Sequence, residues 1–453
     1  MPFTKASLTA LALGFSSLLT LVLAAPSPSY NPAKPAKDPY SRDYWPAPRK
    51  ITGEDLNGTL GGVHIHDPSV VLGPDGHYYA FSSHGLATTS RASKKNSLDG
   101  YWEVVAQVLS PPGSIDDPAQ ANRLWAPDVH RIGDTYYCYY TVSDFGVSKS
   151  FIGLATSKTL QNGSWTDHGL VVSSNSTDAP FPLSKTNTID AAFIQDAKTG
   201  KNYLTYGSWW ANIWQFELTK DLKSVKIPTA RQLSYTYDPV LPTKQEAYAN
   251  MSLSWGGASA EEAPYISYNK KQGFYYLWYS AGFCCGYNPA ALPPPGAEYT
   301  IFVGRSKSPR GPFVDRNGKD LAEGGGSMVY GSHGNTYGPG GQAVISNYHG
   351  RDVLYYHYVN TTYDPLYRDN FKFLGWNPIE WASIMISIVM PRLRDVAKVD
   401  PLQDVQVWLF RYAPAGTASR GPGIRQAEHD NSPRARLGQL KVPRDTACRL
   451  RRL

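Results

Sequence analysis

The segment 66–81, His-Asp-Pro-Ser-Val-Val-Leu-Gly-Pro-Asp-Gly-His-Tyr-Tyr-Ala-Phe, decides the fold. It places one acidic residue ahead of an apolar β-run, and a turn then leads into a second, aromatic-rich β-run. The pattern returns four times along the chain, in residues 125–137, 188–204, 261–277 and 337–356. Three of the five copies carry an acid at this place, namely Asp67, Asp190 and Glu262.

A repeat of about 55–75 residues that contains only short strands is typical of a β-propeller with one four-stranded blade per copy. The sequence therefore predicts an all-β fold, a five-bladed β-propeller. In a propeller the first strand of each blade lines the central channel, so equivalent positions of different blades lie close together. We expect Asp67, Asp190 and Glu262 to meet there, and converging carboxyl groups are a common means of cleaving glycosidic bonds.

The composition changes along the chain divide it into four parts. Residues 1–24 read as a secretory signal peptide, with an early positive charge, an apolar run and small residues before the cleavage point, so we expect a secreted, extracellular protein. Residues 25–50 form an arm rich in Pro, Ser and Lys, and residues 51–383 hold the propeller. Residues 384–453 form an atypical basic tail without β-alternation, which we expect to be disordered.

The net charge of +7 does not indicate an acidic partner. Residues 384–453 hold 13 of the 44 basic and 6 of the 37 acidic residues, which leaves 31 of each in the rest of the chain. We therefore expect neither nucleic-acid nor membrane binding, and a monomer. Asn-X-Ser/Thr sequons support an extracellular route for a glycoprotein. They begin at Asn57, Asn162, Asn175, Asn250 and Asn360.

The three acids suit the cleavage of an acetal. One carboxylic acid has to protonate the departing oxygen, one carboxylate has to activate the attacking water, and a third can adjust the pKa of the acid. A single Asp at the start of a strand more often caps a turn, and we interpret Asp128 in that structural way. Glu261 and Glu262 are neighbours in a strand, so only one of them can face the channel.

Eight short motifs together resemble the secreted endo-1,5-α-L-arabinanases of glycoside hydrolase family 43. They are His-Asp-Pro-Ser (66–69), Leu-Trp-Ala-Pro-Asp-Val (124–129), Ile-Gly-Leu-Ala-Thr-Ser (152–157), Asn-Thr-Ile-Asp-Ala (187–191), Tyr-Gly-Ser-Trp-Trp (206–210), Glu-Ala-Pro-Tyr-Ile (262–266), Cys-Cys (284–285) and Gly-Pro-Gly-Gly (338–341). The resemblance implies hydrolysis of arabinan in plant cell-wall pectin with inversion. It implies that Asp67 is the general base, Asp190 the acid that tunes the pKa, and Glu262 the general acid.

The chain departs from the family pattern at a metal position. Many bacterial relatives carry a His after Gly-Pro-Gly that helps to hold an axial metal, and the residue here is Gly341. His333 or His357 could replace it, although histidines in strand-rich cores are more often structural. We expect no required cofactor, with a single axial calcium or other metal ion as the alternative. Cys284 and Cys285 could form a vicinal disulfide or remain two thiols.

Further residues near the channel-lining strands could contact a sugar. Aromatic rings can stack on sugar rings and polar groups can bind hydroxyls, although aromatics in a propeller also pack between blades. The candidate substrate-binding residues are Trp125, Phe145, Asn187, Ser208 and Trp209. The same scaffold would also suit an exo-acting arabinofuranosidase or a β-xylosidase. A non-catalytic carbohydrate-binding propeller would not require three acids.

Overall fold

The structure of the chain, a computed structural model, describes residues 45–49, 51–54, 60–61, 63–83, 88–109, 124–174, 178–237, 244–246, 260–381 and 386–387. The chain divides into two units, Met1–Pro391 and Arg392–Leu453, and the described residues all belong to the first. The predicted signal peptide and almost all of the predicted tail lie outside the described residues. In the part of the chain that the structure describes, no helix is long and apolar enough to cross a membrane.

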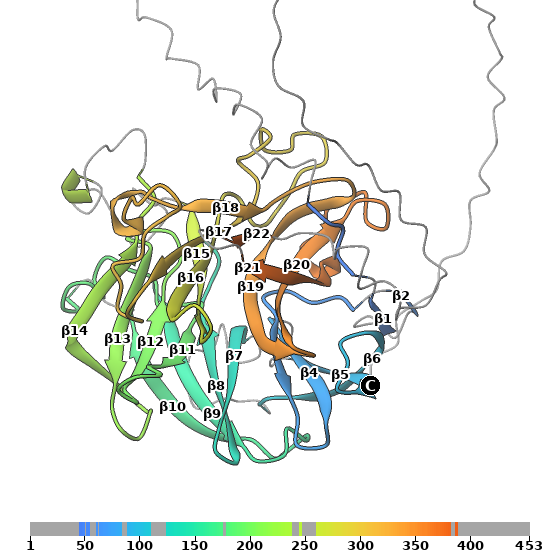
Figure 1. The fold of residues 1–453 in the computed structure, drawn as a ribbon, viewed down its shortest axis with the longest axis horizontal. Coiled ribbons are helices and arrows are strands. Elements are labelled where there is room, and N and C mark those ends of the chain that lie inside the picture. Colours follow the sequence, from blue (N-terminus) through green and yellow to red (C-terminus); the bar gives the residue numbers. More distant parts are fainter. Residues whose placement is uncertain are drawn as a thin grey trace, which may run out of the picture. The chain divides into compact units, whose positions relative to one another are not determined.

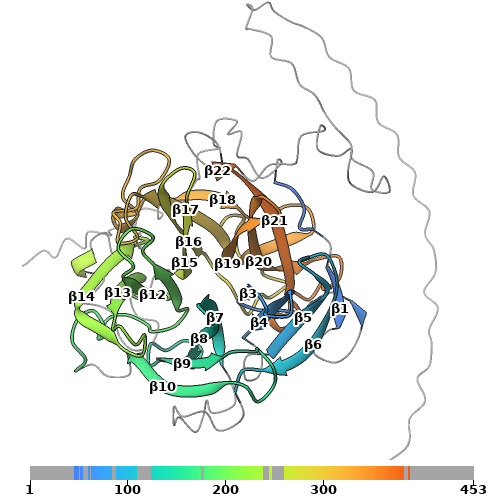
Figure 2. The same ribbon diagram turned by 60° about the horizontal axis from the view of Figure 1, so that its bottom comes forward.

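The described strands form five sheets, which are arranged around a common axis (Figures 1 and 2). The first sheet has the order β2 (Leu60–Gly61), β1 (Ile51–Glu54), β6 (Gly100–Gln107), β5 (Thr88–Lys95), β4 (His77–Ser82) and β3 (Ser69–Leu72). The second has β10 (Thr166–Ser173), β9 (Phe151–Ser157), β8 (Thr135–Val142) and β7 (Trp125–Ile132). The third has β11 (Ala192–Gln195), β12 (Asn202–Tyr206), β13 (Ile213–Leu218) and β14 (Val225–Ser234).

The last two sheets follow the same plan. The fourth has β15 (Glu261–Asn269), β16 (Phe274–Ala281), β17 (Thr300–Ser306) and β18 (Ser327–Tyr330). The fifth has β19 (Thr336–Tyr348), β20 (Arg351–Asn360), β21 (Phe373–Trp381) and β22 (Ile386–Ser387). Two short 3-10 helices, η2 (Leu321–Glu323) and η3 (Asp369–Phe371), lie in the loops of these sheets.

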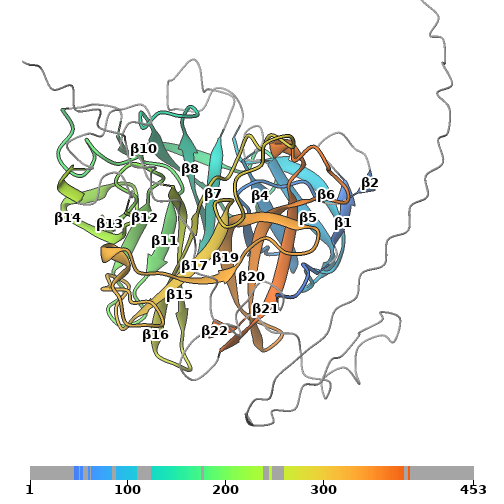
Figure 3. The same ribbon diagram turned by 90° about the horizontal axis from the view of Figure 1, so that it is seen from above.

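The five inner strands close a ring. Strand β3 contacts β7, β7 contacts β11, β11 contacts β15, β15 contacts β19, and β19 returns to β3. Figure 3 shows β7, β11, β15 and β19 running beside one another through the middle of the unit. Paired strands are antiparallel throughout, except that β1 joins the outer edge of the first sheet parallel to β6. The prediction of a five-bladed β-propeller is confirmed.

Buried aromatic and aliphatic side chains fill the junctions between neighbouring sheets. Phe81 of the first sheet and Val129 of the second belong to one such cluster. Trp278 of the fourth sheet and Tyr356 of the fifth belong to another. Equivalent clusters occupy the other three junctions. Much of the aromatic content of the sequence is thus used to hold blades together, because a twisted sheet face offers broad apolar area to its neighbour.

In each blade, the inner strand or the segment just before it has one residue with a left-handed backbone at the axis, with φ between 37° and 56°. These residues are Asp67, Ala126, Asp190, Ala263 and Gly341, and all five line one small cavity of about 40 Å³ on the axis. The hydrogen-bond register shifts around three of them, in β7, β15 and β19. Asp67 and Asp190 therefore occupy equivalent positions. Glu262 stands one residue before its counterpart Ala263, which corrects the sequence-based alignment by one residue.

Two N-terminal segments pack on the last two sheets. Trp45 is buried in the cluster between the fourth and fifth sheets, and Tyr330 Oη donates a hydrogen bond of 2.8 Å to the carbonyl of Pro46. The backbone N–H of Ile65 donates to the carbonyl of Lys372 over 2.7 Å, beside β21. These contacts tie the start of the first blade to the last blade and place Lys372 close to the first acidic motif.

Candidate active site

A cavity of about 570 Å³ lies at the N-terminal ends of the inner strands, and Asp67, Asp190 and Glu262 all line it. Asp67 precedes β3, Asp190 precedes β11, and Glu262 begins β15 with Glu261. The remaining walls come from loops of all five sheets. The structure thus brings together three acids that are 195 residues apart at most in the chain, because each occupies an entry to the ring.

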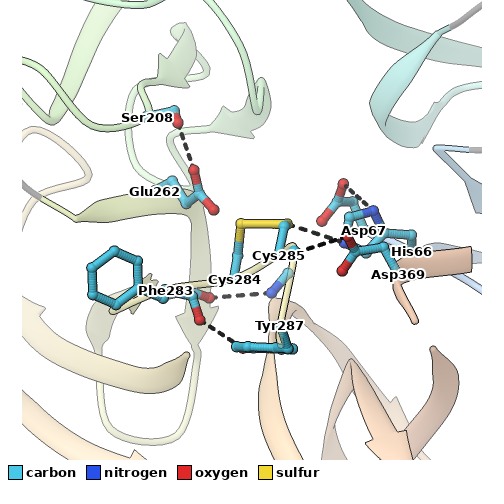
Figure 4. Close-up of a disulfide and its surroundings, with 12 residues drawn as sticks. His66, Asp67, Ser208, Glu262, Phe283, Cys284, Cys285, Tyr287 and Asp369 are labelled. Carbon is cyan, nitrogen blue, oxygen red and sulfur yellow. Dashed lines mark hydrogen bonds and ion pairs between the residues drawn. A yellow bond between two sulfur atoms is a disulfide. The ribbon is translucent and has the colours of Figure 1, made fainter. Parts of the chain in front are cut away.

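Asp67 is held by contacts on several sides, and Figure 4 shows His66 beside it. Ser83 Oγ donates a hydrogen bond of 2.7 Å to Asp67 Oδ2, and His66 Nδ1 lies 3.5 Å from the same oxygen. The backbone N–H of Asp67 donates to His357 Nδ1 over 3.0 Å. The Asp67 side chain keeps 23% of its surface exposed, so this fixed carboxyl group can still meet a water molecule.

Glu262 and Asp190 are more enclosed than Asp67. Ser208 Oγ donates a hydrogen bond of 2.5 Å to Glu262 Oε2. Burial raises the pKa of Glu262, the charge of Asp67 raises it further, and the bonds from Ser208 and Tyr299 oppose the shift. Burial also raises the pKa of Asp190 well above its usual value, with added effects from Glu262 and Asp67. Asp190 Oδ2 accepts a hydrogen bond of 3.0 Å from the N–H of Ala263.

Glu261 points away from the cavity, as the alternation of a strand requires. It is fully buried, and its Oε2 accepts a hydrogen bond of 2.5 Å from Thr236 Oγ1. Burial raises the pKa of Glu261 to about 7. Of the two adjacent glutamates, only Glu262 therefore faces the three-acid cavity.

Asp128 has a structural position. Its Oδ2 accepts a hydrogen bond of 2.7 Å from the N–H of Phe193, which lies in the third sheet. Its Oδ1 lies 2.8 Å from His130 Nε2. Asp128 borders the small axial cavity and not the cavity of the three acids. It thus links the second and third blades beneath the site.

The five predicted substrate-binding residues all line the larger cavity: Trp125, Phe145, Asn187, Ser208 and Trp209. Phe145 is 68% exposed, as expected for an aromatic side chain in a ligand-binding surface. Asn187 is buried, and its Oδ1 accepts a hydrogen bond of 2.5 Å from Ser150 Oγ. The ring of Trp209 lies 5.9 Å from that of Phe283, which is itself half exposed.

Sequence reasoning missed several residues of this site. His66, Ser83, Asp369 and Asn370 line the cavity, as does the pair of cysteines. The Nζ of Lys372, whose side chain is fully buried, lies 2.9 Å from His66 Nε2. His66 could have been suspected because it directly precedes Asp67. Lys372 and Asp369 gave no signal, since they lie in a loop of the last blade outside the repeated strands.

Cys284 and Cys285 form a vicinal disulfide, which resolves the alternative that the sequence left open. Both cysteines line the cavity, and Figure 4 shows the disulfide together with Glu262 and Asp67. Cys138 is buried in the junction between the first and second sheets.

The ligand atoms of His66, Asp67 and His357 lie within 4.8 Å of one another, a spacing that could hold a metal ion. Their contacts do not fit one. His357 Nδ1 already accepts the N–H of Asp67, and the amine of Lys372 lies against His66 Nε2. An ammonium group beside a ligand also disfavours a divalent cation. The other candidate, His333, lies against the backbone carbonyls of Gly331 and Pro46, away from the cavity.

The sequence and the fold match known proteins across the described propeller. Residues 60–383 match the profile of glycosyl hydrolases family 43. The chain is 44% identical over 301 residues to "Probable arabinan endo-1,5-alpha-L-arabinosidase B" of Aspergillus fumigatus, an alignment that covers 65% of this chain and 78% of that protein.

Two solved structures share the fold. The α-L-arabinanase of Cellvibrio cellulosa complexed with arabinohexaose is 27% identical, with a TM-score of 0.61 and coverage of 72% of this chain and 96% of that one. An exo-1,5-α-L-arabinanase from a bovine ruminal metagenomic library is also 27% identical, with a TM-score of 0.58 and coverage of 73% and 98%. The match to the family profile covers most of the sequence, and the matched residues include all three cavity acids. The chain therefore belongs to glycosyl hydrolases family 43.

Proposed function

We propose that the protein hydrolyses α-1,5-L-arabinofuranosidic bonds within arabinan chains, with inversion of configuration. The observation that carries this proposal is the convergence of Asp67, Asp190 and Glu262 on one cavity. The names of the relatives support arabinan as the substrate, and the Cellvibrio cellulosa enzyme is similar in fold and binds arabinohexaose.

Glu262 is assigned as the general acid. Its raised pKa keeps the carboxyl group protonated at a pH where an ordinary glutamate is ionised. The bond from Ser208 fixes one oxygen of the carboxyl group, so the other oxygen can carry the proton into the cavity. The proton passes to the glycosidic oxygen as the bond to the sugar breaks.

Asp67 is assigned as the general base. It removes a proton from the attacking water, which approaches the sugar on the face opposite to the leaving oxygen. Ser83 and the backbone bond to His357 hold Asp67 in place, and its exposed fraction allows the water to reach it. Asp190 sits between these roles. It is fixed to the N–H of Ala263, and burial with the charges of Glu262 and Asp67 raises its pKa. The family resemblance assigns it the role of tuning the proton donor.

An exo-acting arabinofuranosidase or a β-xylosidase is the second candidate, and the likeness to an exo-1,5-α-L-arabinanase favours keeping it. The names of the curated relatives favour the endo mode. Linear α-1,5-arabinan separates the two. An endo enzyme releases a ladder of oligosaccharides early and lowers viscosity with few cleavages, whereas an exo enzyme releases one small product from the start. Failure to cleave either arabinan or aryl glycosides would contradict both and favour a binding module.

Inversion has its own test. Proton NMR of the first products of arabinotriose cleavage should show the β-anomer before mutarotation. Initial release of the α-anomer would contradict the assignment of Asp67 as a base.

The signal-like segment and the sequons support further proposals. The segment 1–24 and the sequons favour secretion of a glycoprotein. We propose that it acts as a monomer on plant cell-wall pectin. Asn162 is exposed and thus accessible to a glycosyl group. Mass analysis of the secreted protein before and after deglycosylation, with size-exclusion chromatography, tests these proposals.

A further inference from the structure

The Cys284–Cys285 disulfide is a part of the cavity wall to which the mechanism above gives no role. Both cysteines are partly exposed and line the same cavity as Asp67 and Glu262. Figure 4 shows the bond in the space between Glu262 and the pair formed by His66 and Asp67. In an inverting reaction the cleaved bond lies between the acid and the base. A sugar bound there would lie against the cavity wall that holds the two sulfur atoms.

The turn that carries the disulfide is anchored to two sheets. The N–H of Phe283 donates to the carbonyl of Ala297 over 2.9 Å, and the N–H of Tyr299 donates to the carbonyl of Phe283 over 2.9 Å. On the other side, the N–H of Gly286 donates to Asp369 Oδ2 over 2.8 Å. The fourth sheet and a loop of the fifth sheet thus hold the disulfide at a fixed place in the wall.

Lys372 connects this wall to the first acidic motif. Its Nζ donates a hydrogen bond of 2.7 Å to the carbonyl of Cys284 and lies 3.9 Å from Cys285 Sγ. The same nitrogen lies 2.9 Å from His66 Nε2, and His66 directly precedes Asp67. A fully buried lysine is costly unless its donors are used, and these contacts use them. The position of the disulfide is therefore fixed relative to the base.

The chemistry of a disulfide suits one face of a sugar. The two sulfur atoms are polarisable and do not compete for hydroxyl groups, so they pack well against C–H groups. The hydroxyl groups of a sugar need hydrogen-bond partners, and polar groups elsewhere in the cavity, such as Asn187 and Asp190, can supply them. A vicinal pair also presents both sulfur atoms on one short turn, which makes a compact apolar surface.

We propose that the Cys284–Cys285 disulfide is a binding surface for the arabinofuranosyl ring next to the cleaved bond. The inference rests on the proposed function for the identity of the sugar. It assigns to the bond a role in substrate affinity that a purely structural crosslink would not have.

The test measures the affinity of the full chain carrying Glu262→Gln for arabinohexaose by calorimetry, before and after reduction with tris(2-carboxyethyl)phosphine. The phosphine reduces the bond to two thiols and becomes the phosphine oxide, with the oxygen and both thiol protons supplied by water. Peptide mass analysis verifies the reduction. Loss of the apolar contact between the disulfide and the sugar should raise the dissociation constant about tenfold. The titrations are run well below the melting temperatures of both forms.

Matched variants separate the surface from the fold. The added substitutions Cys284→Ala and Cys285→Ala should reproduce the weak binding and abolish the response to the phosphine. The added substitution Cys138→Ala should leave the response intact, because Cys138 is buried at another junction. A lower melting temperature with unchanged affinity after verified reduction would overturn the inference.

Activity of the unmodified enzyme on arabinan distinguishes this inference from the proposed function. Cleavage of arabinan together with equal affinities of the oxidised and reduced forms overturns the disulfide surface alone. Redox-dependent binding without cleavage overturns the hydrolase assignment alone. Absence of arabinohexaose binding in either form overturns both.

Discussion

Ser208 and Glu262 form a hydrogen bond of 2.5 Å across the junction between the third and fourth blades. The segment around Ser208 also pairs with the start of β15, because Ser208 and Glu262 form an isolated β-bridge. The proton donor is therefore oriented by the neighbouring blade and not only by its own strand. The packing of one blade on the next thus bears directly on the acid–base chemistry.

Replacing Ser208 by Ala should move the basic limb of the pH–rate profile to higher pH. The Ser208 bond lowers the pKa of Glu262, so its loss raises that pKa and the acid stays protonated longer. The rate at the optimum should fall about tenfold, because the carboxyl group loses an orienting partner. Ser327→Ala, at the outer strand β18, is the control and should keep the profile of the unmodified enzyme. An unshifted basic limb in Ser208→Ala would contradict this role.

Replacing Glu262 by Gln should reduce cleavage of natural arabinan by about 10²–10⁴-fold. An aryl arabinofuranoside with a good leaving group needs little protonation and should lose much less activity. Asp67→Asn removes activation of the water, so it should impair both substrates alike. Glu261→Gln, one residue away and outside the cavity, is the control for Glu262. Inactivity of Glu261→Gln with an active Glu262→Gln would reverse the assignment.

Glu261 should make the folded state less stable as the pH rises. Its pKa is about 7 in the fold and 4.5 ordinarily, so the folded protein binds the proton more tightly than the unfolded chain. Its contribution is complete below about pH 4.5 and is lost by about pH 7, for a change of up to about 3 kcal/mol in the free energy of unfolding. Urea denaturation at pH 5 and pH 8 measures the change. Glu261→Gln should flatten it, and an equal pH dependence in both proteins would count against this account.

Gly341→Ala should impair catalysis by displacing the base. A Cβ atom at this position would lie 2.8 Å from His357 Nδ1 and 2.9 Å from Asp67 Oδ1, and both approaches are too close. We expect a loss of at least tenfold in kcat/KM. Gly350→Ala is the matched control, since Gly350 also has a positive φ but nothing lies within 4 Å of its added Cβ. Equal losses of activity in the two variants would show that backbone strain alone causes the loss. Full activity of Gly341→Ala would contradict the prediction.

Lys372→Met should also shift the basic limb of the pH–rate profile to higher pH, because the positive charge of Lys372 lowers the pKa of Glu262. Methionine keeps most of the volume of the buried side chain and removes the charge. Lys307→Met, at an exposed lysine above Phe274, controls for a change in overall charge. A basic limb that stays in place would show that Lys372 does not act on the acid electrostatically.

Much of the fold could be predicted from the sequence because the repeat is strong. A short apolar run, a turn and an aromatic run recur five times, and each copy became one inner hairpin of a blade. The position of Glu262 was one residue off in the predicted alignment, because the left-handed backbone at Ala263 leaves no mark in the sequence. Glu261 and Glu262 were separable in principle by alternation, but only burial shows which one faces the cavity.

The residues around the base could not be predicted. Lys372 reaches His66 only because the segment before β3 pairs with the start of β21, a contact over 306 positions of the chain. Such pairing forms when the first and last blades close the propeller, and the local sequence pattern does not specify it. The role of the cysteine pair likewise depends on what stands opposite it in space.

The five left-handed positions on the axis have a consequence for how such enzymes diverge. Each position has a positive φ that the surrounding strand imposes. The residues at the five positions are two aspartates, two alanines and one glycine: Asp67, Asp190, Ala126, Ala263 and Gly341. Alanine in this conformation costs about 1 kcal/mol, so the scaffold tolerates a small side chain in a conformation that suits aspartate or glycine better. Repeated duplication of one ancestral blade would supply an equivalent position in every blade. A substitution at such a position changes which side chain borders the axial cavity, provided that its neighbours leave room for the new Cβ atom, which they do not at Gly341.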